Sequence, residues 1–131
     1  MNPEIGFPAF LVLTVVLLAG VAITGLKAKR KIHLRLVALA LLSLAVTIFY
    51  AERLGKVFDL STAGRITPIH LFIAKVTTLG YLAPLLTGFK TLRDPSWRKK
   101  HRICAFTIMG LTLLTAATGA MMIMGSERFP A

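Results

Sequence analysis

Four long apolar stretches take up most of this chain, at about residues 8–26, 32–51, 67–89 and 101–125. Roughly 20 consecutive apolar residues cross the hydrocarbon core of a bilayer as an α-helix, and a helix satisfies its own backbone hydrogen bonds there. The chain has 131 residues, 56% of them hydrophobic, so only short connections and tails remain. The sequence therefore predicts an all-α, four-helix transmembrane bundle that forms one membrane domain over residues 1–131.

The distribution of positive charge predicts how the helices cross the membrane. The formal net charge is +11, and eleven of the sixteen Lys and Arg residues lie in or beside the first and third connections. Such an excess marks cytoplasmic loops. We therefore expect an up-down-up-down bundle in a bacterial inner membrane, with both termini on the non-cytoplasmic side. Because most of the charge clusters in these connections, we expect no nucleic-acid partner, although a basic chain otherwise suggests one.

Each of the three histidines opens one of the last three apolar stretches. His33 and His101 directly follow basic clusters and share the predicted cytoplasmic side, whereas His70 lies on the opposite side. Small or hydroxyl residues recur at helical spacing below each histidine, and such faces usually pack against other helices. These faces comprise Val37, Ala40, Leu44 and Thr47 below His33; Ala74, Thr77, Tyr81, Pro84 and Gly88 below His70; and Ala105, Ile108, Thr112, Thr115 and Gly119 below His101.

Two histidines at one depth on alternate helices suggest a b-type haem between them. Helical bundles hold cofactors between facing helices, and imidazole is an axial ligand of haem iron. We therefore take His33 and His101 as candidate ligands of haem iron. Neighbouring cations are candidates to pair with the haem propionates: Arg30, Lys31, Arg35 and Arg102. The alternative is that both histidines continue the basic loops at the interface and bind nothing.

Two further residues are candidates for chemistry. His70 has no histidine partner on its side, so we expect no second bis-histidine haem. It is a candidate metal ligand, with possible partners among three methionines near the end of the last stretch: Met121, Met122 and Met124. Lys75 is the one strong charge well inside an apolar stretch. Intramembrane charges are costly and usually functional, but a lysine near a helix end also reaches the interface with its long stem.

The prolines predict where helices start and bend. Pro8 suits the first turn of the first helix, and Thr67 followed by Pro68 suits the start of the third. Pro84 lies inside the third stretch. A kink is expected there, because proline removes a backbone hydrogen bond and clashes with the preceding turn.

Several classes of chemistry lack their residues in this sequence. The apolar stretches contain no Asp or Glu, which argues against a proton pump. No phosphate-binding loop, catalytic triad or pair of carboxylates is present, and the single cysteine, Cys104, excludes cysteine-rich zinc and iron–sulfur sites. We therefore predict no catalytic residue, and expect binding or electron transfer more than an enzymatic activity.

Several short motifs carry a family resemblance over about the last hundred residues. They are His33, Ser43 and Tyr50; His70 and Ala83-Pro84-Leu85-Leu86-Thr87; and His101-Arg102-Ile103-Cys104-Ala105 with Thr118-Gly119. On these residues the chain resembles small four-helix membrane proteins of the YozB/CtaM type. The resemblance implies a role in cytochrome oxidase assembly, through the handling of haem. A looser similarity is to transmembrane cytochromes b, in which histidines on alternate helices clamp haem.

Two functional hypotheses follow from the sequence. The first is a small haem-associated membrane protein, either an electron-carrying b-type cytochrome or an oxidase assembly factor. The alternative is a non-catalytic accessory subunit of a larger respiratory or photosynthetic complex, with membrane lipids and other membrane-protein subunits as its partners. Small size, short loops and the absence of membrane carboxylates fit the alternative equally well, so a bound pigment distinguishes the two.

Overall fold

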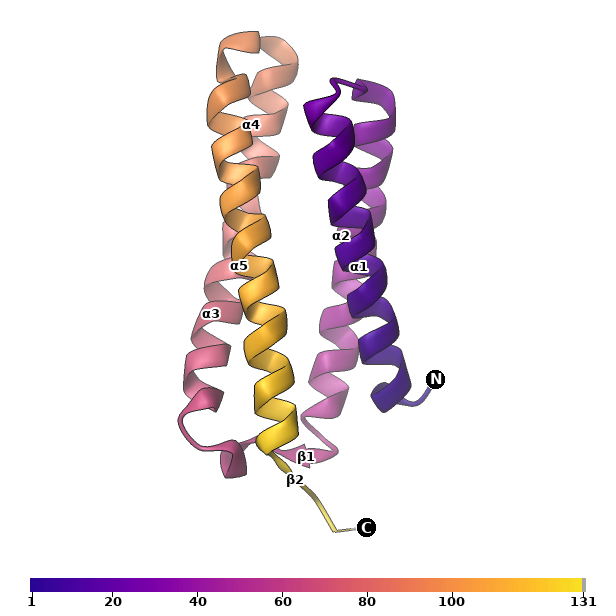
Figure 1. Cartoon of the computed structure of the whole chain (residues 1–131), viewed down its shortest axis with the longest axis vertical. Helices are drawn as coiled ribbons and strands as arrows, with labels where there is room; N and C mark the ends of the chain where they lie inside the picture. The colour runs from indigo at the N-terminus through magenta and orange to yellow at the C-terminus, as the bar shows by residue number, and fades with distance from the viewer. Residues whose placement is uncertain (131) are drawn as a thin grey trace. The chain divides into compact units, whose positions relative to one another are not determined.

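A computed structural model describes residues 1–130, which are almost entirely helical (Figure 1). The α-helices are α1 (Pro3–Leu26), α2 (Arg30–Leu54), α3 (Ile66–Gly80), α4 (Leu82–Arg93) and α5 (Arg98–Gly125). Since α3 and α4 follow each other directly, the described residues form four helices that are long and apolar enough to cross a membrane. The predicted all-helical class and four spanning helices are confirmed, as expected for an integral membrane protein.

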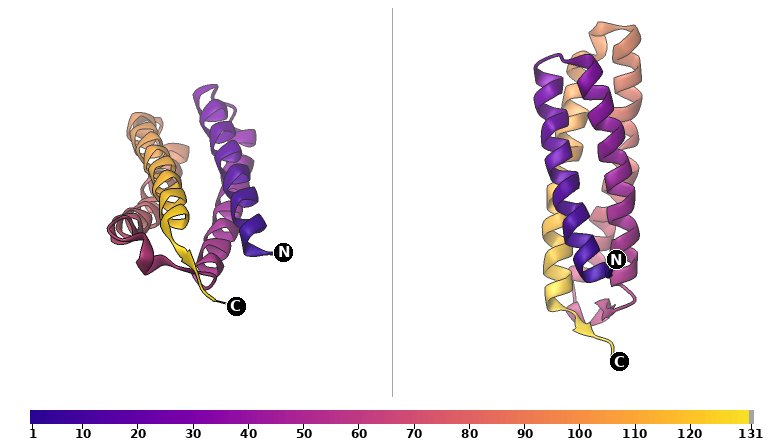
Figure 2. Two further views of the ribbon diagram at one scale, coloured as in Figure 1. Left: turned by 60° about the horizontal axis from the view of Figure 1, so that its bottom comes forward. Right: turned by 90° about the vertical axis from the view of Figure 1, so that its right-hand side faces the viewer.

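The chain forms two compact units, each built on a helical hairpin. The N-terminal hairpin contains α1, α2 and the strand β1 (Phe58–Asp59), which pairs antiparallel with the strand β2 (Glu127–Arg128) near the chain's end. Arg128 also forms a 3.2 Å ion pair with Glu4 at the start of α1. The C-terminal hairpin contains the 3₁₀ turns η1 (Leu60–Ala63) and η2 (Pro95–Trp97) with α3, α4 and α5. In each hairpin the helices run antiparallel (Figure 2).

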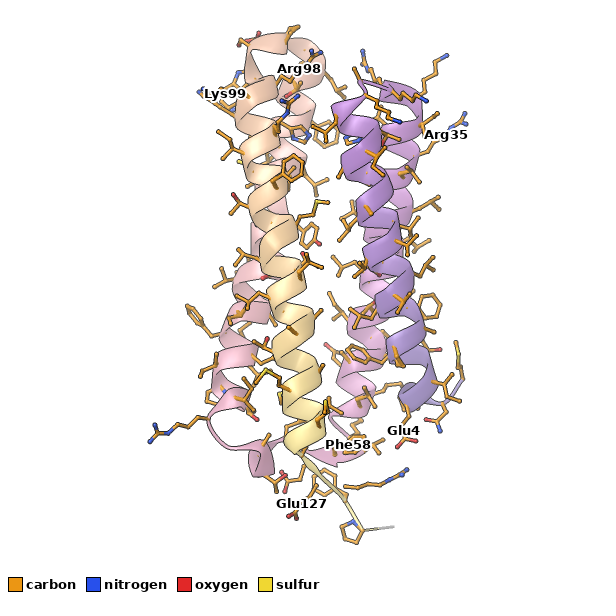
Figure 3. The ribbon with its side chains drawn as sticks, viewed as in Figure 1. Glu4, Arg35, Phe58, Arg98, Lys99 and Glu127 are labelled. Atoms are coloured by element: carbon orange, nitrogen blue, oxygen red, sulfur yellow. The ribbon has the colours of Figure 1, made fainter. Side chains whose placement is uncertain are left out.

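Small hydroxyl residues are buried in these hairpins, while many large apolar side chains lie outside. Leu42 and Leu79, for example, are 65% and 70% exposed, and such side chains project from the ribbons in Figure 3. The buried polar residues are Thr14, Ser43, Thr47, Thr77, Thr112 and Thr118. Helices in a membrane gain little from burying large apolar groups against one another, so close contact through small and hydroxyl residues holds them together.

The first helix begins earlier than predicted. The Asn2 side chain accepts a 2.9 Å hydrogen bond from the Glu4 N–H, and Pro3 occupies the first helical position. An asparagine cap followed by proline is a strong helix start. The asparagine side chain accepts a hydrogen bond from a backbone N–H that has no partner within the helix, and proline has no N–H that would need one. Pro8 therefore lies inside α1, and its expected place in the first turn was wrong.

The third helix also differs from the prediction at its start. It begins at Ile66 without a side-chain cap. The Thr67 hydroxyl donates instead to the backbone oxygen of Leu60 in η1. The predicted cap by Thr67 was therefore wrong, because this hydroxyl ties the helix to the preceding 3₁₀ turn.

The disturbance expected at Pro84 is confirmed, one turn before the proline. The regular helix stops at Gly80 and resumes at Leu82. Pro84 has no N–H to donate to the Gly80 carbonyl, and its ring crowds that carbonyl. The third span is therefore divided into α3 and α4.

Candidate functional site

His33, near the start of α2, packs against the end of α1 in the N-terminal hairpin. Its Nδ1 lies 2.9 Å from the backbone oxygen of Val21 and 3.4 Å from the Thr24 Oγ1. A carbonyl oxygen only accepts, so Nδ1 carries the proton and Nε2 carries the lone pair; this assignment follows from the hydrogen bonds. The ring also lies against Gly25, where an added Cβ would come within 3.1 Å of the imidazole Cε1.

His101 has an equivalent place in the C-terminal hairpin. Its Nδ1 lies 3.2 Å from the Thr87 Oγ1, and the Thr87 hydroxyl donates its own proton to the Ala83 carbonyl at 2.7 Å. Thr87 therefore accepts from His101, which again places the proton on Nδ1 and the lone pair on Nε2. A Cβ added at Gly88 would lie 3.2 Å from the His101 Cε1.

His70 repeats this arrangement in the same hairpin. Its Nδ1 lies 3.0 Å from the Thr118 Oγ1 on α5, and the Thr118 hydroxyl donates to the Leu114 carbonyl at 2.9 Å. Thr118 is therefore the acceptor, and Nδ1 again carries the proton. A Cβ added at Gly119 would lie 2.9 Å from the His70 Cε1.

All three histidines thus rest on a Thr-Gly dipeptide of the neighbouring helix, an arrangement that we call the Thr–Gly cradle. The chain has three histidines and three Thr-Gly dipeptides, and they pair one to one. The cradles join His33 to Thr24-Gly25, His101 to Thr87-Gly88 and His70 to Thr118-Gly119. Sequence reasoning missed this pairing, although the matching numbers of histidines and dipeptides were a visible signal.

The cradles differ in their place along the hairpins. Those of His33 and His101 stand at the basic connections, α1–α2 and α4–α5, and in both the dipeptide precedes its histidine in the chain. The His70 cradle stands at the opposite end of the C-terminal hairpin. At the corresponding end of the N-terminal hairpin a tyrosine takes this role, since a Cβ added at Gly6 would lie 2.6 Å from the Tyr50 ring.

A ladder of side-chain hydrogen bonds fixes α3 against α5. Tyr81 lies 2.7 Å from Thr112, and Thr77 lies 3.0 Å from Thr115. Both α5 threonines donate their own hydroxyl protons to carbonyls four residues earlier. They therefore accept from α3, as Thr118 accepts from His70. The prediction that these hydroxyl-rich faces pack on a neighbouring helix is confirmed.

A smaller hydroxyl cluster joins α1 to α2. Thr14 is 1% exposed; its Oγ1 lies 2.8 Å from the Ser43 Oγ and 3.0 Å from the Thr47 Oγ1. Thr14 donates to the Phe10 carbonyl at 2.7 Å, and Thr47 donates to the Ser43 carbonyl at 2.9 Å. The Thr14 oxygen therefore accepts from the Ser43 hydroxyl. This cluster sets the register of the helix that carries His33.

The candidate propionate-pairing cations lie beside the two histidines at the basic connections. Arg30, Lys31 and Arg35 flank His33 on α2, Arg102 follows His101 on α5, and all four side chains are exposed. Figure 3 labels Arg35, which extends outward from its hairpin. At its basic connection each hairpin thus combines one cradled imidazole with exposed cationic side chains, and a joint site made from both hairpins stays a prediction.

The remaining candidates occupy separate positions. Lys75 is exposed on α3, while Met122 is buried on α5 and Met121 and Met124 are exposed. Within residues 1–130, no three His, Cys, Asp or Glu side chains gather as a metal site. The metal role predicted for His70 stays a prediction, as does the functional role of Lys75.

Comparison of the chain with profiles of known protein families, with curated proteins and with solved structures gave no match. The resemblance to the YozB/CtaM type therefore stays a prediction, and the functional argument depends on the geometry of the chain's own residues.

Proposed function

We propose that this chain is a small membrane protein that holds one b-type haem, with His33 and His101 as its axial ligands. It would serve as an electron carrier or in the assembly of cytochrome oxidase. The observation that supports this most is the repetition of one cradle at the basic connection of each hairpin. Two separate hairpins present an imidazole in the same tautomer and the same packing, at the end where cations are concentrated.

The tautomer suits ligation of iron. In each of these histidines the Nδ1 proton is donated to a carbonyl or hydroxyl of the neighbouring helix, so the Nε2 lone pair is the basic one. Metal-bound histidines usually make this second hydrogen bond, which orients the ring and strengthens the ligand. A histidine that merely continued a basic loop would not need its ring fixed in this way.

The glycines suit the same role. Gly25 and Gly88 leave space for an imidazole to lie directly on a helix backbone, and a single added methyl would press on each ring. A ring confined by packing and by a hydrogen bond of its Nδ1 loses little further freedom on binding iron. The two sites are therefore pre-organised for a ligand.

The cations at the same ends of the hairpins complete the set of donors. Arg30, Lys31, Arg35 and Arg102 are exposed and long enough to turn toward carboxylates, and guanidinium groups pair well with them. When bound, the haem would supply one-electron chemistry; the protein would fix its axial ligands and neutralise its propionates.

Orientation belongs to the proposal as well. Eleven of sixteen Lys and Arg residues lie at the two basic connections, so we place these connections in the cytoplasm and both termini on the non-cytoplasmic side of a bacterial inner membrane. The proposed haem would then lie near the cytoplasmic surface.

Absorption spectroscopy of the full chain, expressed with ample haem and purified in detergent, tests the proposal. We expect a b-type band in the reduced-minus-oxidised spectrum of the wild type. We expect its loss or strong reduction in His33→Ala and in His101→Ala, and its retention in His70→Ala. Far-UV circular dichroism of each variant checks that the helices remain.

A wild-type protein without any b-type band would contradict the proposal and favour the accessory-subunit alternative. A band that survives both substitutions but disappears in His70→Ala would also contradict the proposal, because it would identify His70 as the haem ligand.

A further inference from the structure

The connection between α4 and α5 carries an unusual cluster around the chain's single tryptophan. The Lys90 Nζ lies 4.2 Å from the centre of the Trp97 ring, and the Lys100 Nζ lies 4.3 Å from it. The two ammonium groups are therefore at most about 8.5 Å apart. They come from different helices, Lys90 from the end of α4 and Lys100 from the start of α5.

The indole attracts each ammonium group but does not neutralise it. Trp97 is partly exposed, and cation–π contacts on such a ring are modest, because the ring quadrupole carries no net charge. Two like charges on one indole repel each other, and an anion beside them relieves that repulsion. Both lysine side chains are exposed, so an anion from outside the chain can reach them.

The connection supplies no such anion itself. Residues 90–102 contain six Lys and Arg residues and one acidic residue, Asp94. The Asp94 carboxylate accepts a 3.0 Å hydrogen bond from the Ser96 N–H and caps η2. This hydrogen bond lowers the pKa of Asp94, so the carboxylate stays ionised while it holds the turn in shape.

The position of Trp97 decides what kind of anion this is. Tryptophan at the end of a membrane span settles at the level of the lipid headgroups, and Trp97 directly precedes α5. The anions concentrated at that depth are lipid phosphates. The other basic connection, residues 27–35, has five Lys and Arg residues but no tryptophan ring for them to contact.

We propose that Lys90, Trp97 and Lys100 form a binding site for the phosphate of an anionic phospholipid headgroup. The indole sets the depth of the site, and the two ammonium groups contact the phosphate from α4 and α5. This site is independent of the proposed haem, because it uses none of the three histidines.

Fluorescence of Trp97 tests the site directly, since no other tryptophan contributes. We would reconstitute the full chain in phosphatidylcholine vesicles with a fixed fraction of phosphatidylglycerol. In one sample the phosphatidylglycerol is brominated close to the headgroup, and in another an equal amount of phosphatidylcholine is brominated. We expect brominated phosphatidylglycerol to quench Trp97 more strongly, which reports local enrichment of the anionic lipid.

Substitutions then separate a built site from general surface charge. Lys90→Gln with Lys100→Gln should reduce the preference for phosphatidylglycerol by about tenfold, whereas Lys90→Arg with Lys100→Arg should preserve it. The matched control, Lys27→Gln with Lys29→Gln, removes the same charge from the other basic connection and should leave the preference intact.

Three results would overturn the proposal. The first is equal quenching by both brominated lipids in the wild type. The second is an equal loss of preference in both glutamine double variants. The third is loss of the preference when inorganic phosphate is added at matched ionic strength, which would show that the cluster binds free phosphate in place of a lipid headgroup.

Discussion

At the scale of single residues, three glycines determine whether the imidazoles can hold their positions. Gly25, Gly88 and Gly119 each face a histidine ring at a distance that an added Cβ would make tighter than ordinary contact. By contrast, a Cβ added at Gly110 on α5 would meet nothing within 4 Å. The chain therefore offers both a test substitution and a matched control within the same kind of helix.

Alanine at the cradle glycines should weaken haem binding. We expect Gly25→Ala and Gly88→Ala each to lower haem affinity by about tenfold, because displaced ligand rings commonly cost that much in metal binding. Alanine favours helix over glycine, so a loss cannot be attributed to a weaker helix. Haem titration of the purified variants, followed by absorbance, measures the effect.

The controls for this prediction are two other glycines. Gly110→Ala should bind haem as the wild type does, and so should Gly119→Ala, which presses only on His70. Equal haem affinity in all four variants would show that the cradles do not position the ligands.

The sequence was sufficient to single out the histidines but not their environment. His33 and His101 follow basic clusters, and the common depth that these clusters imply stays a prediction. The partners of these histidines could not be predicted, because whether Nδ1 meets a carbonyl, as at Val21, or a hydroxyl, as at Thr87, depends on how one helix is rotated against the next. The hydrophobic pattern of a membrane helix fixes that rotation poorly.

At the scale of elements, hydroxyl groups take the place that large apolar side chains have in a water-soluble core. The α3–α5 ladder and the Thr14 cluster satisfy buried hydroxyls across helices. Thr14, Thr112 and Thr115 donate their own hydroxyl protons to carbonyls of their own helices. They therefore accept the interhelical hydrogen bonds from Ser43, Tyr81 and Thr77, respectively.

Removal of the central hydroxyl of the N-terminal hairpin should destabilise it. Thr14→Val preserves the side chain's shape but removes the hydroxyl that accepts from Ser43 and contacts Thr47. We expect the free energy of unfolding to fall by about 1–2 kcal/mol, the usual range for interhelical hydrogen bonds and buried polar groups left without a partner. Equilibrium unfolding in mixed detergent micelles measures this.

Thr107→Val is the matched control, since Thr107 is exposed on α5. It should change the free energy of unfolding by no more than about 0.5 kcal/mol. A similar cost at both positions would mean that the Thr14 cluster adds nothing specific to helix pairing.

The elements themselves were largely predictable, and the exceptions have local causes. Apolar length gave four spans, and the effect of Pro84 was foreseen because proline lacks the donor that Gly80 needs. The true start of α1 was missed, because Asn2-Pro3 lies among polar residues outside the apolar stretch. Only the cap geometry shows that the helix extends to that point.

At the scale of the whole molecule, the two hairpins repeat one design: a Thr-Gly dipeptide, a basic connection, then a histidine. The repeat was not visible as sequence similarity, because the connections differ in length and in their residues. The proposed orientation puts both connections in the cytoplasm, and it can be checked without reference to haem.

Labelling with a membrane-impermeant maleimide tests that orientation. In a Cys104→Ser background, Ser96→Cys in the α4–α5 connection should react only after spheroplasts are lysed. Lys56→Cys, beyond the end of α2, should react in intact spheroplasts. The opposite pattern would place the basic connections outside the cell and contradict the proposed topology.

Electron paramagnetic resonance of the oxidised, haem-loaded protein tests the central claim most directly, because it reports the axial ligands of the iron. Two imidazoles give a low-spin ferric signal. We predict this signal in the wild type and in His70→Ala, and its conversion to high-spin iron or its disappearance in both His33→Ala and His101→Ala. An unchanged low-spin signal in either of those two variants would contradict ligation by this pair.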